Sequence, residues 1–303
     1  MISVIIPTHN PDANRLARTI AALRLQDLPK SEWELLLIDN ASEPPLNRAN
    51  WELSWHDRAQ LIREDSLGLT SARLRGFREA HGELFVLVDD DNVLRPDYLS
   101  ISGEIAAKHP QLGAFGGASI PEFESVPPAW MNEFIPMLAV RDLGSKEIVM
   151  AWNGTYPSCA PLGAGMVIRR KAALEWTEEI ASDSRRRVLD RTGASLVSGG
   201  DNDMVISAMK RGWQVGYFPA LVLNHLIPAR RCDAGYLSRL NRAMSESWMR
   251  LLTIHDINPW PPIPAWSVPL RQAKAWIRHR AWAGKAGRVR WAGACGHFEG
   301  RKR

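Results

Sequence analysis

The sequence predicts an α/β fold: a mostly parallel sheet flanked by helices, followed by a helical, basic extension at the C-terminal end. Short apolar runs alternate with amphipathic stretches through the first hundred residues, which is the pattern that a helix-covered parallel sheet requires. Acidic residues follow directly after two of these runs, and parallel sheets bind ligands outside the carboxyl ends of their strands. A surplus of basic residues among tryptophans predicts the extension.

Three apolar runs in the first hundred residues are predicted to be buried strands. Residues 2–6 are β-branched or small and uncharged, and Pro7 follows them. The other two runs end in acids: residues 35–38 in Asp39, and residues 84–88 in Asp89, Asp90 and Asp91. Because the carboxyl ends of parallel strands meet at one edge of a sheet, these acids are predicted to face one crevice.

Helical spacing of apolar residues predicts the helices between these strands. Leu16, Ile20 and Leu23 lie on one face behind Asp12, a candidate N-cap. A second helix is predicted at residues 70–81, before Gly82. The second half of the chain is expected to contain cleft-shaping loops at 120–136 and 157–165, a helix at 202–211, and strands at 214–218 and 221–224, the latter ending at His225.

Size and composition exclude several classes of protein. With 303 residues, 45% hydrophobic residues and a formal charge of +5, the chain is not disordered, collagen-like or disulfide-stapled. Cys159, Cys232 and Cys295 are odd in number and far apart, so a reducing compartment is expected. No signal-like leader and no apolar run near the ~18 to 20 residues of a spanning helix is found, so we expect a cytoplasmic protein, peripheral on a membrane at most.

The basic charge is concentrated in residues 270–303. They hold ten basic residues against one acid, a net of +9 that leaves −4 for the rest of the chain. Leu270, Ala273, Ile277 and Ala281 share a predicted helical face, and cations occupy its flank. Aromatic residues among cations suit an anionic membrane surface. A helix packed on the body explains the same pattern, and nucleic acid is not an expected partner.

The aspartate cluster is a candidate metal site. Asp89, Asp90 and Asp91 repel one another unless a hard cation or an extended loop separates their charges. In an extended segment alternate side chains share a face, so Asp89 and Asp91 can converge on one Mg²⁺ or Mn²⁺ ion while Asp90 points elsewhere. An acidic turn capping residues 95–99 explains the same three residues.

Other polar residues allow two interpretations each. Asp39 is either a turn residue with local hydrogen bonds or a ligand-binding carboxylate. Asp201 and Asp203, before a helical stretch, are either an N-cap with favourable dipole charge or reacting groups. His225, alone after an apolar strand, is either a core histidine or a metal ligand.

Seven short motifs occur in a fixed order along residues 1–230, and each is weak alone. They are Val4-Ile5-Ile6-Pro7-Thr8-His9-Asn10; Leu37-Ile38-Asp39-Asn40-Ala41-Ser42; Gly68, Ala72-Arg73, Gly76 and Ala80-His81-Gly82-Glu83; Leu87-Val88-Asp89-Asp90-Asp91; Gly163-Ala164-Gly165-Met166; Gly200-Asp201-Asn202-Asp203; and Tyr217-Phe218-Pro219 before His225. In this order they resemble glycosyltransferase family 2, the inverting, metal-dependent nucleotide-sugar enzymes with the Rossmann-like GT-A fold.

The resemblance implies a role for each matching position. Asp39 takes the place of the carboxylate that accepts a hydrogen bond from the base, typically uracil, and Asp201 takes that of the catalytic base. The other nucleotide-binding positions are Pro7, Thr8, Arg73 and Asp90, and the metal positions are Asp89, Asp91 and His225, which would hold Mg²⁺ or Mn²⁺ against the diphosphate.

The resemblance also implies an organisation and a reaction. Residues 1–115 would be the nucleotide-sugar half and residues 116–230 the acceptor half of one GT-A domain, with residues 231–303 as the extension. The donor would be a nucleotide sugar, with UDP as the first expectation, dTDP as the second and GDP also open. The acceptor would be a hydroxyl group of a glycan or lipid-linked glycan in polysaccharide biosynthesis, lying against Trp130 and Trp152, whose faces suit sugar rings.

Two departures from the family pattern bear on the site. Gly200 stands where the family often has Glu before the base, which leaves Asp203 as an alternative base. Asn92 stands where a further Asp often follows the metal motif.

Two rival functions explain part of the sequence. Residues 89–93 also fit the D-x-D-x-V pattern of haloacid-dehalogenase-type phosphatases, in which Asp89 would be the nucleophile. A non-catalytic subunit that binds a nucleotide sugar or a membrane is the other alternative.

Overall fold

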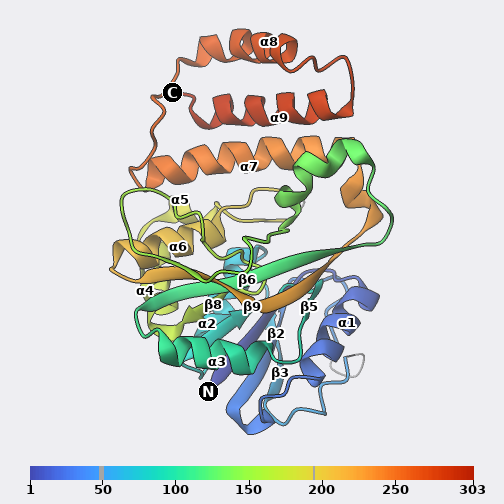
Figure 1. Cartoon of the computed structure of the whole chain (residues 1–303), viewed down its shortest axis with the longest axis vertical. Helices are drawn as coiled ribbons and strands as arrows, with labels where there is room; N and C mark the ends of the chain where they lie inside the picture. Colours follow the sequence, from blue (N-terminus) through green and yellow to red (C-terminus); the bar gives the residue numbers. More distant parts are fainter. Residues whose placement is uncertain (48–50, 194) are drawn as a thin grey trace. The chain divides into compact units, whose positions relative to one another are not determined.

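The computed structural model describes residues 1–47, 51–193 and 195–303 and confirms the predicted α/β class (Figure 1). Its strands are β1 (Ile2–Thr8), β2 (Trp33–Asn40), β3 (Ala59–Glu64), β4 (Leu84–Leu87), β5 (Asn92–Leu94), β6 (Leu112–Phe123), β7 (Ile148–Met150), β8 (Val167–Arg169) and β9 (Gln214–Ile227). Its α-helices are α1 (Ala13–Arg24), α2 (Leu69–Glu79), α3 (Tyr98–Lys108), α4 (Arg170–Ser182), α5 (Ser184–Arg187), α6 (Gly200–Lys210), α7 (Ala234–Ile254), α8 (Val268–Arg278) and α9 (Lys285–Gly300).

The strands form one sheet in the order β3-β2-β1-β4-β8-β6-β9-β5, with β7 beside β9. Strand β1 is parallel to β2 and β4, and β2 is parallel to β3. The pairs β4 with β8, β8 with β6, and β9 with β5 are antiparallel. The carboxyl ends of β1, β2 and β4 therefore meet at one edge, as the acid-terminated apolar runs predict.

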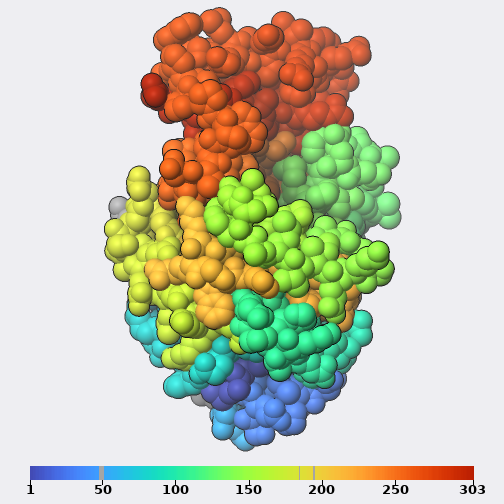
Figure 2. Space-filling model, turned by 60° about the vertical axis from the view of Figure 1, so that its left-hand side comes forward, coloured from blue at the N-terminus to red at the C-terminus, as the bar shows by residue number. Residues whose placement is uncertain are grey.

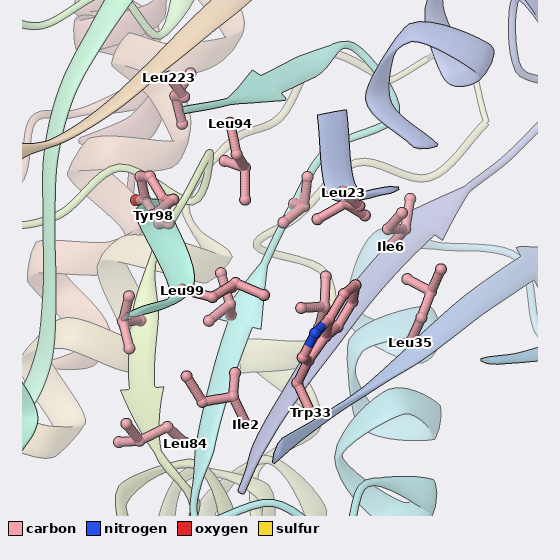
Figure 3. Close-up of a cluster of buried hydrophobic side chains, with 14 of the residues drawn as sticks. Ile2, Ile6, Leu23, Trp33, Leu35, Leu84, Leu94, Tyr98, Leu99 and Leu223 are labelled. Atoms are coloured by element: carbon pink, nitrogen blue, oxygen red, sulfur yellow. The ribbon is translucent and has the colours of Figure 1, made fainter. Parts of the chain in front are cut away.

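Alternation along the strands divides the core between the two faces of the sheet. Val4 and Ile6 of β1 pack with helices α1 and α3, and ten members of this cluster are labelled in Figure 3. Ile5, which points to the opposite face, packs with α2, α4 and α6. Asp12 caps α1 as predicted, since its carboxylate accepts hydrogen bonds from the amides of Asn14 and Arg15, both at 3.1 Å.

The chain folds into two compact units. Unit 1 comprises Met1–Glu122, Ala139–Asp183 and Met204–Leu226, and it contains the sheet edge described above. Unit 2 comprises Phe123–Leu138, Ser184–Asp203 and Ile227–Arg303. The segments of each unit are discontinuous in the sequence because the chain passes between the units several times.

Two predicted elements differ from the structure. The loop predicted at residues 120–136 is wrong at both ends, because β6 continues to Phe123 and a 3₁₀ helix, η2 (Ala129–Leu138), follows. The two strands predicted at 214–218 and 221–224 are one strand, β9. Pro219 does not interrupt it, because β9 pairs with β7 before this residue and with β5 after it.

The predicted helical C-terminal extension is confirmed, and its helices pack together within unit 2. Helix α9 lies between α7 and α8 (Figure 1). Gly296 permits the closest approach to α7, since a Cβ atom there would lie 2.0 Å from the carbonyl oxygen of Arg242. Red-orange and red atoms in Figure 2 mark the surface of α8 and α9. Among the described residues, none of the helices is long and apolar enough to cross a membrane.

Candidate functional site

The carboxyl ends of β1, β2 and β4 bring polar side chains to one edge of the sheet in unit 1. Thr8, the last residue of β1, lies opposite Asp39 in the strand register. The Thr8 hydroxyl donates a hydrogen bond to Oδ2 of Asp90, which follows β4. Pro7 is buried one residue earlier. Four of the five predicted nucleotide-binding residues therefore share this edge, and their role in binding stays a prediction.

Asp39 is a buried, ionised carboxylate that organises the loop after β2. Its Oδ1 accepts a hydrogen bond from the amide of Ser42 at 3.2 Å, and its Oδ2 accepts from the amide of Leu46 at 3.0 Å and from Arg63 Nη1 at 2.7 Å. Burial raises the pKa of Asp39, but the hydrogen bonds from the Ser42 side chain, Arg63 and the two amides outweigh it and hold the pKa below its usual range. A nucleotide base that bonds to Asp39 has to replace one of these donors.

Two arginines lie near this edge, and only one of them was predicted. Arg63 comes from β3, a strand that the apolar pattern does not reveal, and its guanidinium also bonds to Asp65 at 2.8 Å. Arg73 is buried on α2, which packs against β1 and β2. Asn40 connects the same loops, since its Oδ1 accepts from the amide of Gly68 at 2.8 Å.

Asp91 and His225 form the pair that could hold a cation. Both are buried, and His225 Nε2 lies 3.4 Å from Asp91 Oδ1. Two contacts between backbones bring them together: His225 pairs with Asn92 across β9 and β5, and the amide of Leu226 donates to the carbonyl of Asp91 at 2.8 Å. The Asn92 side chain also donates to Asp91 Oδ1 at 3.2 Å. Asn92 therefore orients the carboxylate at the position where the family often has another Asp.

The side chains of Asp91 and His225 fit a divalent ion whose remaining coordination positions are filled by a bound substrate. No cluster of three potential ligands from His, Cys, Asp and Glu occurs among the described residues, so Asp89 is not gathered with Asp91 and His225. A carboxylate oxygen beside an imidazole suits Mn²⁺ or Mg²⁺, which bind in many enzymes through one or two protein groups and the oxygens of a substrate diphosphate.

Asp201 and Asp203 lie in unit 2, in the first turn of α6, and their surroundings differ. Asp201 is partly exposed, and its Oδ1 accepts from the amide of Asn202 at 3.1 Å. Asp203 is completely buried. Its carboxylate accepts from Arg186 Nη2 at 2.8 Å and lies 2.7 Å from His255 Nε2. Asp203 is therefore engaged within the protein, and the role of Asp201 as the base stays a prediction.

No local pattern in the sequence predicted Arg186 or His255 as partners of Asp203. They lie 17 and 52 residues from Asp203 along the chain, so no local spacing joins them. Gly200 has a local explanation: a Cβ atom there would lie 2.3 Å from Asp190 Oδ2. The buried carboxylate of Asp190 thus occupies the space beside the position where the family often has Glu.

Replacing Asp203 by Asn is expected to lower the free energy of unfolding by about 3 to 5 kcal/mol, because it removes a buried carboxylate that is ion-paired with the Arg186 guanidinium. Urea unfolding followed by circular dichroism measures this loss. The matched variant Asp201→Asn loses only a favourable charge in the first helical turn and is expected to cost less than about 1 kcal/mol. Equal stability of the two variants would contradict a structural role for Asp203.

Three further residues of the predicted motifs and acceptor site, Gly165, Trp130 and Trp152, take part in packing within their own units. Gly165 has φ of +76°, and its carbonyl accepts from the Tyr98 hydroxyl at 2.6 Å. It is therefore required by a buried turn before β8. Trp130, in unit 2, lies under Lys285 Nζ at 5.9 Å from its ring centroid. Trp152, in unit 1, is partly buried and packs against the core residues on the Ile5 face of the sheet.

The chain is similar in sequence to known glycosyltransferases. The profile of glycosyl transferase family 2 matches residues 3–172, more than half of the chain. An N-acetylglucosaminyltransferase of Azorhizobium caulinodans is 22% identical over 233 residues, which cover 75% of this chain and 55% of that protein. The chain thus spans about half the length of this relative.

Two solved structures share the fold. S. aureus TarS 1-349 in complex with UDP-GlcNAc has a TM-score of 0.54 and 14% identity, covering 93% of this chain and 72% of that one. A mannosyltransferase from Pyrobaculum calidifontis in complex with GDP-Man and Mn²⁺ has a TM-score of 0.55 and 17% identity, covering 97% and 73%. At these identities the likeness shows the GT-A fold alone. The phosphatase alternative is set aside, because the family profile includes the Asp89–Asp91 segment, and the chain belongs to glycosyltransferase family 2.

Proposed function

We propose that the chain transfers a sugar, with inversion, from a nucleotide-sugar donor to an acceptor hydroxyl and that it uses a divalent ion. The observation that carries the proposal is the buried pair of Asp91 and His225 at the carboxyl edge of the sheet, with His225 Nε2 3.4 Å from Asp91 Oδ1. This pair lies beside the aspartate segment whose Asp90 bonds to Thr8. These contacts support a common site for the metal ion and the nucleotide at this edge of the sheet.

Residues 1–115 form the donor half in this proposal. Pro7, Thr8 and Asp90 line the nucleotide position, and Arg73 supports it from α2. Asp39 orders the loop at residues 41–46, and a base reaches it by replacing the Leu46 amide, the Ser42 amide or Arg63. UDP is the first choice of nucleotide; the TarS complex with UDP-GlcNAc supports it, while the mannosyltransferase complex with GDP-Man supports GDP as the alternative.

Asp91 and His225 hold the metal ion in this proposal, with Asp89 reaching it when the donor is bound. When bound, Mg²⁺ or Mn²⁺ offsets the negative charge that develops on the departing nucleoside diphosphate. Asn92 keeps the Asp91 carboxylate in place through its 3.2 Å hydrogen bond. The Mn²⁺ in the mannosyltransferase complex supports the choice of a divalent ion.

Asp201 is the proposed general base. Its partly exposed carboxylate can take the proton of the acceptor hydroxyl, whose oxygen then attacks the anomeric carbon from the face opposite the leaving diphosphate. One displacement of this kind inverts the configuration of the sugar. Asp203 does not compete for this role, because Arg186 and His255 engage its buried carboxylate.

The acceptor and the location complete the proposal. Residues 116–230 would contribute the acceptor half, where Trp152 and Trp130 offer aromatic faces to a sugar ring. A glycan or lipid-linked glycan in polysaccharide biosynthesis is the proposed acceptor. A lipid-linked acceptor places the chain at the cytoplasmic face of a membrane, bound from outside.

A panel of nucleotide sugars tests this function. Each compound is incubated with the chain and Mn²⁺, and thermal stabilisation and release of the nucleoside diphosphate are measured. We expect one donor to raise the melting temperature and to be hydrolysed slowly without an acceptor, and chelation of the metal to abolish both effects. Stabilisation without release by any donor would favour the non-catalytic alternative, and no effect of any donor would contradict the proposal.

A further inference from the structure

Helix α8 turns an apolar side away from the helices that it packs against. The side chains of Trp266, Leu270 and Ile277 are 73%, 65% and 66% exposed. Ile277 follows Leu270 by seven residues, so the two share one face of α8, and Trp266 lies just before the helix in the 3₁₀ helix η4 (Ala265–Ser267). Trp282, just beyond the helix, is 56% exposed. Trp266, Leu270, Ile277 and Trp282 are called here the outer face of α8.

The opposite side of α8 is fixed by contacts within unit 2. Val268 and Ala275 are buried. Trp276 packs edge-on against Trp291 of α9, with ring centroids 4.8 Å apart. The indole nitrogen of Trp291 donates to the carbonyl of Gln272 at 3.0 Å. Rolling the helix to bury its outer face would break these contacts, so the outward direction of the apolar side is set by packing.

Cations border the outer face. Arg271, Lys274 and Arg278 are exposed, and their spacing of three, four and seven residues places them along one flank of α8. The single acid of residues 270–303, Glu299, is already engaged by Arg242 and by Gln272 Nε2 at 2.9 Å. The surface around the outer face is therefore both apolar and positively charged.

We propose that the outer face of α8 docks on the surface of an anionic lipid membrane. The aliphatic side chains enter the boundary between headgroups and acyl chains, while Arg271, Lys274 and Arg278 bind the anionic headgroups. The two tryptophans suit this boundary because the indole ring is amphipathic. A second copy of the chain fits less well, because a symmetric contact through this face would bring two sets of like charges together.

This surface deepens the proposed function, since a lipid-linked acceptor lies at a membrane. Its test is nevertheless independent of sugar transfer, because binding to a bilayer of defined lipids requires no donor, acceptor or metal. Failure to bind vesicles leaves the nucleotide-sugar panel unaffected, and failure of the panel leaves vesicle binding unaffected.

Cosedimentation of the full chain with lipid vesicles tests the proposal. We expect the chain to bind vesicles that contain phosphatidylglycerol and to bind pure phosphatidylcholine vesicles much more weakly, with the difference decreasing as salt is added. The double variant Leu270→Ser/Ile277→Ser should lower the partition coefficient at least roughly tenfold. Reversing two cations, in Lys274→Glu/Arg278→Glu, should lower it by a similar factor.

Matched controls distinguish binding through the outer face of α8 from non-specific binding to vesicles. Leu25, at the end of α1 in unit 1, is 67% exposed, so Leu25→Ser removes an equally exposed leucine. Lys108→Glu/Lys146→Glu makes the same change in net charge at exposed positions of unit 1. Both controls should bind like the unmodified chain, and circular dichroism should show that all four variants are folded.

Three results would overturn the proposal. One is equal binding to both kinds of vesicle, and another is equal binding by the outer-face variants and their controls. The third is the absence of vesicle binding together with a dimer, seen by sedimentation velocity, that Leu270→Ser/Ile277→Ser dissociates. That result would identify a second copy of the chain as the occupant of the outer face.

Discussion

Replacing Asp201 by Asn is expected to lower the rate of sugar transfer by roughly 10²- to 10⁴-fold, the usual contribution of a positioned general base. Asparagine keeps the size and the hydrogen bond of Asp201 Oδ1 to the Asn202 amide, but it cannot take a proton from the acceptor hydroxyl. Donor binding should stay unchanged, because the groups proposed to bind the donor lie on β1, β2 and the segment after β4. Initial rates and calorimetric donor affinity, measured on the same preparation, separate the two effects.

The control for this variant is a carboxylate of similar exposure outside the site. Asp97, which pairs with Arg95 at 2.7 Å after β5, is suitable, and Asp97→Asn should transfer sugar at the unmodified rate. If Asp201→Asn also transfers at the unmodified rate, Asp201 is not the base. If it loses donor affinity to the same extent as activity, Asp201 acts in binding and the proposed role is wrong.

Replacing Asp91 by Asn is expected to remove the dependence of donor binding on Mn²⁺, with a loss of at least roughly tenfold in affinity at saturating metal. The amide keeps the shape of the buried side chain but carries no charge to bind the cation. Calorimetric titration with UDP, without metal and with Mn²⁺, measures the effect. Affinity without metal should change little, because the groups proposed to hold the base lie at β1 and β2.

The neighbouring His225 offers a second, graded change at the same ion. His225→Gln keeps a polar group at the position opposite Asn92 but presents a weaker ligand, so it should reduce the Mn²⁺ effect without removing it. A thermal melt of each variant checks the fold, since both residues are buried. Unchanged Mn²⁺ dependence in Asp91→Asn would contradict the assignment of the metal site.

The local sequence pattern was sufficient to predict the elements that form the sheet edge at the carboxyl ends of β1, β2 and β4. Strands β1, β2 and β4 are predicted by uninterrupted apolar runs, because strands of a parallel sheet are buried on both faces. Helix α1 is predicted by the helical spacing of its apolar residues and by its N-cap. Strand β3 was not predicted, because only two of its residues, Ala59 and Ile62, are buried and it shows no apolar run. Without β3 the sequence could not reveal Arg63, the cation that holds Asp39.

Contacts between distant segments set the parts of the site that pattern could not predict. Asp201 and Asp203 look alike in the sequence, and only Arg186 and His255, brought by α5 and α7, distinguish them. The C-terminal extension also contains a feature that only contacts between segments decide. Leu270, Ala273 and Ile277 were predicted to share a face, and the structure shows them exposed while Ala281 is buried. Amphipathicity identifies such a face, but the choice of packing side depends on Trp276 and Trp291.

The configuration of the released sugar tests the central claim most directly. The nucleotide sugar that the panel identifies is incubated with the chain and Mn²⁺, and the anomeric protons are followed by NMR before the free sugar equilibrates. The account predicts that an α-linked donor gives the β-anomer first, that chelating the metal stops the reaction, and that Asp201→Asn does not produce it. Initial appearance of the α-anomer, or turnover that continues without metal, would contradict the account.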